Sequence, residues 1–388
     1  MRSMPLRFRG AALEAKTTLR DGTHRAATLE ATWRRFARKA AHAGITRIAD
    51  LTGLDTLGIP VFAAIRPMGR SLSTQQGKGL TPLAAKVSAL MESLETWTAE
   101  HIAAPVVTGS ARQLGTRAID VRALPRPRGR LDRGARWRWV EGRDLATDEP
   151  VLVPLEAVTL DTVFRAPPVF DVSSNGLASG NVLVEAILHG LCEVLERDAE
   201  AAWRRAGGDR RIVLDTIEGP ARDLIDRIAA AGARVFVWDL GAAELPVIGC
   251  AIMEDPREPA WRTLGFYQGF GAHLVPEVAV ARAVTEAAQT RLTYIAGARD
   301  DFFPFDYERA TDPELLADLW DRFAAPCDDP CSFDELPRID ATSLGDGLAQ
   351  LVARAGHVVA VDLTHPVLGV PVAKVLVPGR ATDIEAMG

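Results

Sequence analysis

Residues 174–197 read SNGLASGNVLVEAILHGLCEVLER, and this stretch determines how the rest of the chain is interpreted. A turn that contains Gly and Ser precedes a predicted amphipathic helix, whose leucine, isoleucine and valine side chains form one face. At about 100° per residue the polar side chains gather on the other face: Asn181, Glu185, Glu193, Glu196 and Arg197. Glutamates that share a face repel one another unless cations or hydrogen-bond donors lie close to them. The rest of the chain must supply these partners.

The composition is that of an ordinary globular protein that is long enough to bury a full core. Of the 388 residues, 47% are hydrophobic and 25% are charged, and the net charge is −6. This balance provides no basic surface for nucleic acid, so we expect no nucleic-acid partner. No apolar run reaches the roughly 20 residues of a membrane span, and the N-terminus lacks the apolar core of a signal peptide. We therefore expect no membrane partner and a cytoplasmic location.

Two further predicted helices carry oxygen ligands. One places Glu92 and Glu95 three residues apart, so both lie on one face, and the other carries Glu286 and Gln289. Hard oxygen ligands favour Mg²⁺, Ca²⁺ or Mn²⁺ over metals that prefer sulfur or nitrogen. A di-iron site in a helical bundle would use paired Glu-x-x-His motifs, and these helices contain none.

The length of the acidic face points to an elongated ligand. Glu185 and Glu196 lie about 16 Å apart at 1.5 Å per residue, which is too far for one ion. The pattern therefore predicts several ions along an anion such as a triphosphate, with Lys16, Arg197 and Arg291 binding the remaining phosphate oxygens. By pattern alone, solvated acidic helix faces remain the more common explanation.

Two segments are predicted to be loops. Residues 69–82, GRSLSTQQGKGLTP, contain glycines and a lysine but not the order of a Walker A motif. Residues 122–136, RALPRPRGRLDRGAR, hold six arginines together with two prolines and two glycines. An acidic peptide or protein could bind this second segment, and a solvated loop is the plainer alternative.

These segments together resemble the YcaO family, from about Lys16 to Asp301. SNGLASGN followed by VLVEAILHGLCEVLERDA resembles the family signature, and GKGLTPLAAKVSALMESLE resembles its earlier Glu-x-x-Glu helix. KTTLRDGTHRAAT and ADLTGLDTLGIPVFAAIRP resemble its N-terminal segments, and EAAQTRLTYIAGARDD resembles its third helix. The resemblance implies an α+β fold, in which mixed or antiparallel sheets pack with amphipathic helices around a central site for ATP and Mg²⁺. It also implies one domain over residues 1–388, with a nucleotide-contacting part (1–68), a catalytic core (69–301) and a C-terminal part (302–388).

The resemblance also implies roles for single residues. The family's metal ligands fall on six glutamates: Glu92, Glu95, Glu185, Glu193, Glu196 and Glu286. Its nucleotide contacts fall on seven positions: Lys16, Thr23, Asn181, Glu185, Arg197, Gln289 and Arg291. Of these, Arg197 and Arg291 are the expected catalytic cations. Thr96 stands where many members have arginine, which leaves one phosphate contact without its usual donor.

The implied reaction is the activation of a peptide backbone amide. A nucleophile adds to the carbonyl carbon, the resulting oxyanion attacks the γ-phosphorus of ATP, and phosphate leaves with the former amide oxygen. Phosphorylation turns a very poor leaving group into a good one, and the protein contributes positioning and charge neutralisation. A substrate Cys, Ser or Thr as nucleophile gives an azoline, whereas a sulfide equivalent gives a thioamide.

Two departures from the family pattern favour the thioamide. Azoline-forming members typically end in a Pro-x-Pro-x-Pro tail, whereas this chain ends in VPGRATDIEAMG. It also lacks the fused leader-peptide-binding domain of some cyclodehydratases. We therefore expect a stand-alone member that acts on a peptide or protein substrate with a TfuA-like partner, and a homodimer fits the resemblance. Azoline formation, a non-catalytic peptide-binding role and an accessory role in ribosomal-protein methylthiolation are the alternatives.

Overall fold

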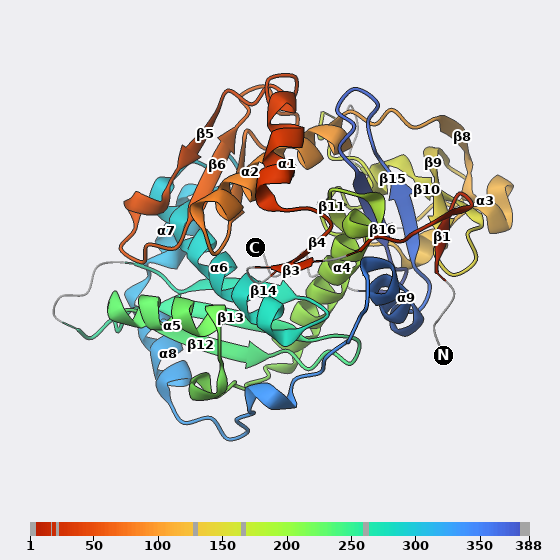
Figure 1. The fold of residues 1–388 in the computed structure, drawn as a ribbon. Helices are drawn as coiled ribbons and strands as arrows, with labels where there is room; N and C mark the ends of the chain where they lie inside the picture. The colour runs from red at the N-terminus through yellow and green to blue at the C-terminus, as the bar shows by residue number, and fades with distance from the viewer. Residues whose placement is uncertain are drawn as a thin grey trace.

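The computed structural model describes residues 5–16, 18–20, 23–126, 131–163, 168–258 and 264–380, with the backbone alone for residues 18–20. Within these residues, helices and antiparallel sheets are arranged around one long helix, α4 (Leu183–Ala206), as Figure 1 shows. The fold is therefore α+β with antiparallel sheets, which confirms the expectation from the sequence.

The largest sheet packs on one side of α4. Its order is β10-β9-β15-β16-β11. Strand β8 lies outside this order and pairs with residues 136–140 of β9. In this sheet β16 pairs with β11 on one side and β15 on the other, so Lys374 lies opposite both Leu177 and Val361. Its strands are β8 (Val106–Ser110), β9 (Arg136–Asp144), β10 (Pro150–Pro154), β11 (Leu177–Ser179), β15 (Val359–Asp362) and β16 (Val372–Leu376).

Two three-stranded sheets each pack against a long helix that follows them in the chain. The first sheet and its helix are β5 (Arg47–Asp50), β6 (Val61–Ile65), β7 (Thr74–Lys78) and α2 (Pro82–Glu100). The second sheet and its helix are β12 (Arg234–Asp239), β13 (Val247–Met253), β14 (Tyr267–Ala272) and α6 (Pro276–Ala296).

A glycine lets each of these sheets approach its helix closely. A Cβ on Gly77 of β7 would lie 1.9 Å from the Ala89 nitrogen of α2. A Cβ on Gly269 of β14 would lie 2.1 Å from the Ala287 nitrogen of α6. Any larger residue would push the strand away from the helix, because the obstructing atoms belong to the backbone.

Caps and prolines fix the ends of the three long helices. The Thr81 hydroxyl accepts a hydrogen bond from a first-turn amide of α2, and Pro82 and Pro276 occupy first-turn positions of α2 and α6. Helix α4 ends at Gly207 with φ 65°, and α6 ends at Gly297 with φ 56°. Both glycines adopt the left-handed conformation that terminates helices.

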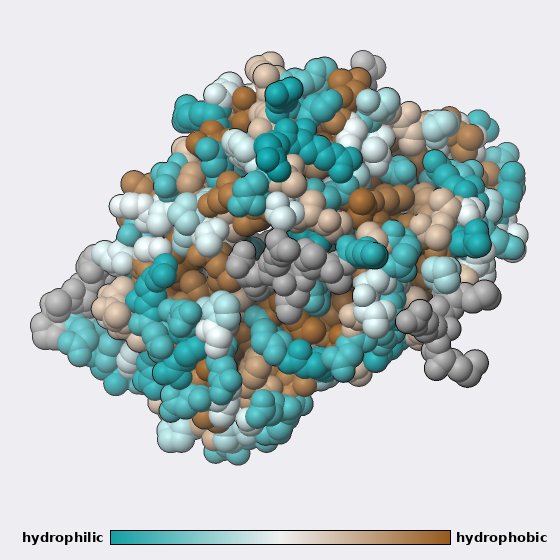
Figure 2. Space-filling view, viewed as in Figure 1, coloured by the Kyte–Doolittle hydropathy of each residue, from teal (hydrophilic) through white to brown (hydrophobic). Residues whose placement is uncertain are grey.

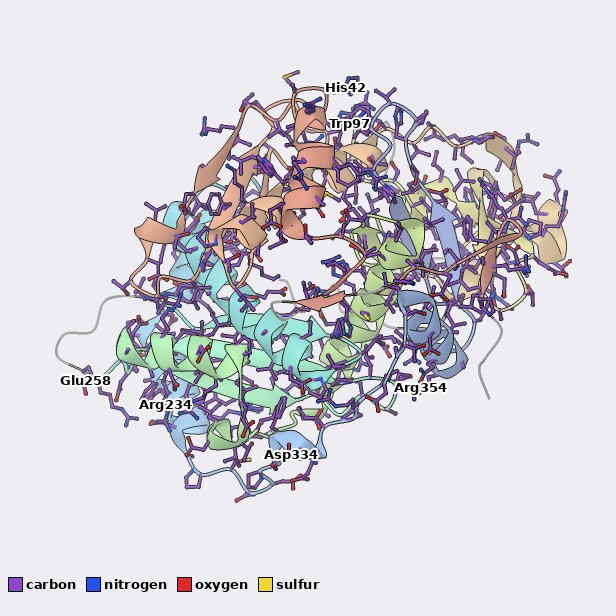
Figure 3. The ribbon with its side chains drawn as sticks, in the orientation of Figure 1. His42, Trp97, Arg234, Glu258, Asp334 and Arg354 are labelled. Atoms are coloured by element: carbon purple, nitrogen blue, oxygen red, sulfur yellow. The ribbon has the colours of Figure 1, made fainter. Side chains whose placement is uncertain are left out.

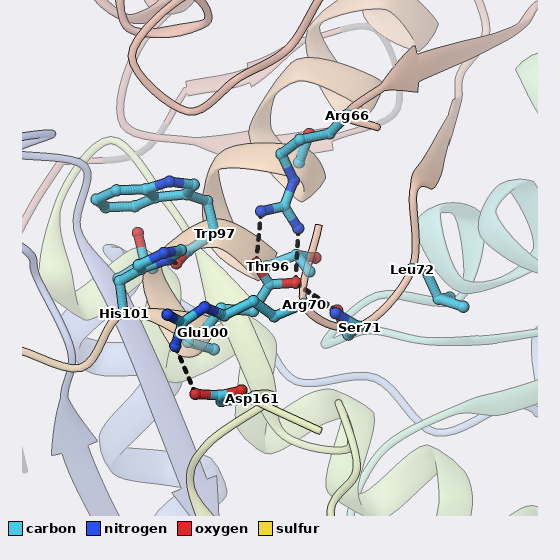
Figure 4. A network of polar contacts seen from close by, with 12 residues as sticks. Arg66, Arg70, Ser71, Leu72, Thr96, Trp97, Glu100, His101 and Asp161 are labelled. Atoms are coloured by element: carbon cyan, nitrogen blue, oxygen red, sulfur yellow. Dashed lines mark hydrogen bonds and ion pairs between the residues drawn. The ribbon is translucent and has the colours of Figure 1, made fainter. Parts of the chain in front are cut away.

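A buried ion pair holds the loop after β6 against the end of α2 (Figure 4). Arg66 donates to both carboxylate oxygens of Glu100, at 2.6 and 2.7 Å, and the Ser71 amide and hydroxyl donate to one of them. Burial raises the pKa of Glu100, but the Arg66 and Ser71 hydrogen bonds outweigh it and leave that pKa lowered. Trp97 of the same helix stacks on His101 with ring centroids 4.4 Å apart.

The remaining elements cover these layers. They are β1 (Arg7–Phe8), β2 (Ala11–Ala12), β3 (Thr18–Arg20), β4 (Thr23–Arg25), α1 (Leu29–Phe36), α3 (Ala111–Leu114), α5 (Pro220–Ala230), α7 (Pro304–Ala310), α8 (Pro313–Ala324) and α9 (Leu344–Ala355). One apolar core around α4 includes Phe8 near one end of the chain and Val377 near the other. The face of the molecule drawn in Figure 2 is mainly hydrophilic. In the described ranges, no helix is long and apolar enough to span a membrane.

Candidate functional site

Helices α2, α4 and α6 surround a cavity of about 1000 Å³. Strand β7 and the segment Thr23–Arg25 complete its wall, and Figure 1 shows β4 in the space between α1, α4 and α6. The loop after β6 also lines the cavity, through Ser71 and Leu72. The buried pair of Arg66 and Glu100 holds this loop in place. Elements that lie far apart in the sequence therefore meet at one site.

Most of the residues singled out from the sequence line this cavity. They are Thr23, Glu92, Glu95, Asn181, Glu185, Glu193, Glu196, Arg197, Glu286 and Gln289. The carboxylates of three helices thus face one space, as the helical spacing predicts. Asn181 precedes α4 rather than lying within it, because the helix is capped at Val182.

Two of the predicted nucleotide contacts do not lie at the cavity. Arg291 is fully buried and makes ion pairs with Asp55, at 2.8 Å, and with Glu254, at 2.7 Å. These pairs fasten α6 to the segments before β6 and after β13, so the guanidinium has a structural position here. Lys16 is exposed and lies outside the cavity wall. The prediction that Arg291 acts as a catalytic cation therefore has no support from this geometry.

Sequence reasoning missed Arg282, which does line the cavity. Arg282 lies four residues before Glu286 on α6, hence on the same face, whereas Arg291 lies five residues after it and points away. The electrostatic field of Arg282 acts on Glu193, Glu196 and Glu286. The i, i+4 spacing was the signal in the sequence that identifies this arginine.

Other cations reach the cavity from outside the three helices. Lys78 of β7 pairs with Glu286 of α6 at 2.5 Å. Burial raises the pKa of Glu286, but Lys78 and Arg197 outweigh it and leave the pKa lowered. Arg299 lines the cavity near Glu92 and stabilises its charge. Arg299 therefore supplies a cation close to Glu92. Thr96, which also lines the cavity, supplies no cation there.

Four other carboxyl groups have raised pKa values. Burial raises the pKa of Glu92 and of Glu193 to about 7, although Glu92 remains exposed to the cavity. Burial followed by repulsion from Glu92 and Glu193 raises the pKa of Glu95 well above its usual range. Burial and the Glu286 charge raise the pKa of Glu196. A bound divalent cation would hold these groups in the ionised form.

The donor set fits Mg²⁺ that shares its ligands with phosphate. In the described ranges, no three His, Cys, Asp or Glu side chains converge as a complete metal cluster. Mg²⁺ commonly binds only one or two carboxylates and takes its other ligands from water and substrate phosphates. Carboxylates spread along a cavity with Lys78, Arg197 and Arg282 provide this arrangement.

Besides Glu286, two more of the predicted metal ligands already have hydrogen-bond partners. Glu185 accepts hydrogen bonds from the Arg25 guanidinium, at 3.1 Å, and from the Ala26 amide, at 2.8 Å. Glu196 accepts one from the Ala272 amide at 2.7 Å. Glu185 therefore ties the N-terminal segment across the cavity, in addition to any role towards a ligand.

Comparison with known proteins adds a family match. The model of the family described as "YcaO cyclodehydratase, ATP- and Mg²⁺-binding" matches residues 76–381. A relative from Methanothermobacter thermautotrophicus is 35% identical over 377 residues, which cover 92% of this chain and 96% of the relative. A protein described as lying in the tfuA 3′ region of Rhizobium leguminosarum bv. trifolii is 36% identical, with 88% of this chain and 85% of that protein covered.

Solved structures match nearly the whole chain. The structure of YcaO from Methanopyrus kandleri bound with AMPPCP and Mg²⁺ is 28% identical with a TM-score of 0.77, and the match covers 96% of each chain. A heterocyclase in complex with substrate and cofactor also has a TM-score of 0.77, at 22% identity, and covers 98% of this chain and 55% of its own. This second likeness concerns the fold alone.

Proposed function

This chain belongs to the YcaO family, and from that premise we propose that it converts a backbone amide of a peptide or protein into a thioamide. The family is one of ATP-dependent enzymes of the cyclodehydratase type, and its cofactors are ATP and Mg²⁺. The nucleophile in the proposed reaction is a sulfide equivalent.

One observation carries the proposal. Glutamates from α2, α4 and α6 line a single cavity of about 1000 Å³ together with Lys78, Arg197 and Arg282. Glu92, Glu95, Glu193, Glu196 and Glu286 would hold Mg²⁺, and the three cations would hold phosphate oxygens. Arg197 is kept in place by Glu200, whose carboxylate accepts from it at 2.9 Å.

The proposed chemistry asks the chain to position charges rather than to form a covalent intermediate. ATP supplies a phosphoryl group for the amide oxygen, which can then leave as phosphate. The arginines and Lys78 neutralise charge where it develops, and the cavity wall holds the peptide carbonyl against the phosphate. The sulfide equivalent adds to the carbonyl carbon, and loss of phosphate leaves a carbon–sulfur double bond.

The choice between thioamide and azoline rests on different observations. The likeness to a protein encoded in a tfuA region supports thioamide formation with a TfuA-like partner. The description of the family as a cyclodehydratase supports the second candidate, azoline formation on a substrate Cys, Ser or Thr. A peptide-binding role without catalysis is a third candidate, against which the full set of cavity carboxylates argues.

We further propose that residues 1–388 act as one domain. The apolar core around α4 joins Phe8, from the proposed nucleotide-contacting part, to Val375 and Val377 from the C-terminal part. Glu185 joins the N-terminal segment to α4 through Arg25. These contacts support a single folding unit in which all three parts contribute to the site.

Mass spectrometry of a modified peptide tests the proposed function. The full chain is incubated with ATP, Mg²⁺, sulfide and a candidate peptide encoded beside its gene, with and without the neighbouring partner protein. We expect replacement of one oxygen by sulfur, dependent on ATP and lost in Glu193→Gln. Loss of one water without sulfur would establish azoline formation instead. An unmodified peptide together with no Mg²⁺-dependent ATP binding would favour the non-catalytic role.

A further inference from the structure

Strand β8 leaves one edge of the large sheet open. It pairs antiparallel with β9 from Val106 opposite Val140 to Ser110 opposite Arg136. In the described ranges, no further strand pairs with its other edge; the Ser110 amide donates to the Gln113 side chain and the Gly109 carbonyl accepts from the Trp139 indole, so the open part is Val106–Thr108. Val106 and Val107 are 44% and 47% exposed. An exposed edge of this kind can accept a further strand.

Exposed arginines surround this edge. Arg136 and Arg138 alternate along β9 with two buried tryptophans, so both project from the outer face, where Arg138 lies opposite Thr108. Arg112 follows β8 in the chain and is also exposed. Within the described ranges, none of these three arginines has a side-chain hydrogen bond or ion pair to a carboxylate. Figure 2 shows mainly hydrophilic residues at the end of the molecule where Figure 1 places α3 and β8.

The charge of this surface selects its occupant. The chain has a net charge of −6, so three arginines without carboxylate partners near one strand are a local excess of positive charge. Pairing of β8 with β8 of a second copy would bring two arginine sets together, and like charges across strands are destabilising. An acidic peptide would instead gain charge pairs as well as backbone hydrogen bonds.

The geometry of an added strand matches the arginines. Neighbouring strands lie about 4.8 Å apart, so a peptide strand beside β8 would lie about 10 Å from β9. Alternate peptide side chains would share the face of Arg136 and Arg138, within reach of an extended arginine. The valines of β8 would cover apolar side chains on the peptide.

We infer that the open edge of β8 is the docking surface for an acidic, extended segment of the peptide substrate. This inference rests on the proposed function, because it takes the occupant to be the substrate. Docking at β8 would raise the local concentration of the residue to be modified at the cavity.

A binding assay on the full chain tests the inference without ATP. The probe is a fluorescent peptide of alternating Glu and Thr, about six residues long, which is close to the length of β8. We expect saturable binding that weakens with salt, and a loss of at least tenfold in the double variant Arg136→Glu/Arg138→Glu. Arg47→Glu, an exposed arginine on strand β5 of another sheet, is the matched control and should bind as the wild type does.

Further arms separate the sources of any binding. A peptide of the same sequence with alternate backbone nitrogens methylated should bind at least tenfold more weakly, because it cannot pair along the edge. Mg²⁺–ATP binding, measured separately, should be equal in the wild type and the double variant, so a failed cavity is distinguished from a failed docking edge. Equal binding of the methylated peptide, no loss in the double variant, or no binding at all would overturn the inference. Tighter binding of single-stranded RNA, or a dimer that the double variant abolishes, would also overturn it.

Discussion

The raised pKa of Glu193 gives a direct test of the cavity electrostatics. Burial raises this pKa from 4.5 to about 7. At 1.36 kcal/mol per pKa unit, the unfolding free energy of the metal-free protein is lower by about 3 kcal/mol above pH 7, where this group is ionised in the folded state, than below pH 4.5. Below about pH 4.5 the carboxyl is neutral in both states and costs nothing. Between pH 4.5 and 7 only the folded state holds the proton, so stability falls as the pH rises, and above 7 the loss is complete.

Denaturant unfolding at pH 5 and at pH 7.5, without divalent cations, measures this loss. The wild type should lose more stability between these two values than Glu193→Gln, by up to about 3 kcal/mol. Added Mg²⁺ should stabilise the wild type at pH 7.5 and stabilise the variant much less, because a ligand stabilises only the state that binds it. Glu218→Gln, at an exposed carboxylate before α5, is the control and should behave as the wild type does. Equal pH dependence in the wild type and Glu193→Gln would refute the reasoning.

Four further substitutions test the cavity arginine, two buried ion pairs and the close contact of β7 with α2. Arg282→Gln should weaken Mg²⁺–ATP binding at least tenfold in calorimetry. Arg291→Gln should instead lower the unfolding free energy by about 3–5 kcal/mol, since it leaves buried carboxylates unpaired. Weakened binding in Arg291→Gln and unchanged binding in Arg282→Gln would restore the role first expected of Arg291. Glu100→Gln should cost a similar amount in denaturant unfolding, because its buried arginine partner loses its counter-charge, and an unchanged midpoint would contradict this. Gly77→Ala should destabilise the protein by about 1–3 kcal/mol through overpacking against α2, while Gly53→Ala, where no atom lies within 4 Å of the added carbon, should not.

The sequence could predict which side chains of the site share one helix face, because this follows from helical periodicity. Once the part of 174–197 that follows the turn is a helix, the side on which Glu185, Glu193 and Glu196 lie follows from the rise and turn of the helix. The expectation for Arg291 came from its charge and from the family resemblance; five residues from Glu286, it points to a different side of the helix. Arg282, four residues before Glu286, lies on the same face as Glu286 and lines the cavity.

Contacts between distant segments could not be predicted. The ion pair of Lys78 with Glu286 joins residues 208 apart, and no spacing rule links them. The glycines of residues 69–82 predict a loop, yet residues 74–78 form β7. This strand is stabilised by its position between β6 and α2, where Gly77 permits contact with the helix backbone. Tertiary packing therefore overrides the weak local preference.

Calorimetric titration of the full chain with a non-hydrolysable ATP analogue tests the central claim most directly. We expect binding to require Mg²⁺ and to fall at least tenfold in both Glu193→Gln and Glu286→Gln, because these carboxylates share the metal with the phosphates. Binding that is independent of Mg²⁺, or that is unchanged in both variants, would contradict the assignment of this cavity as the ATP and Mg²⁺ site.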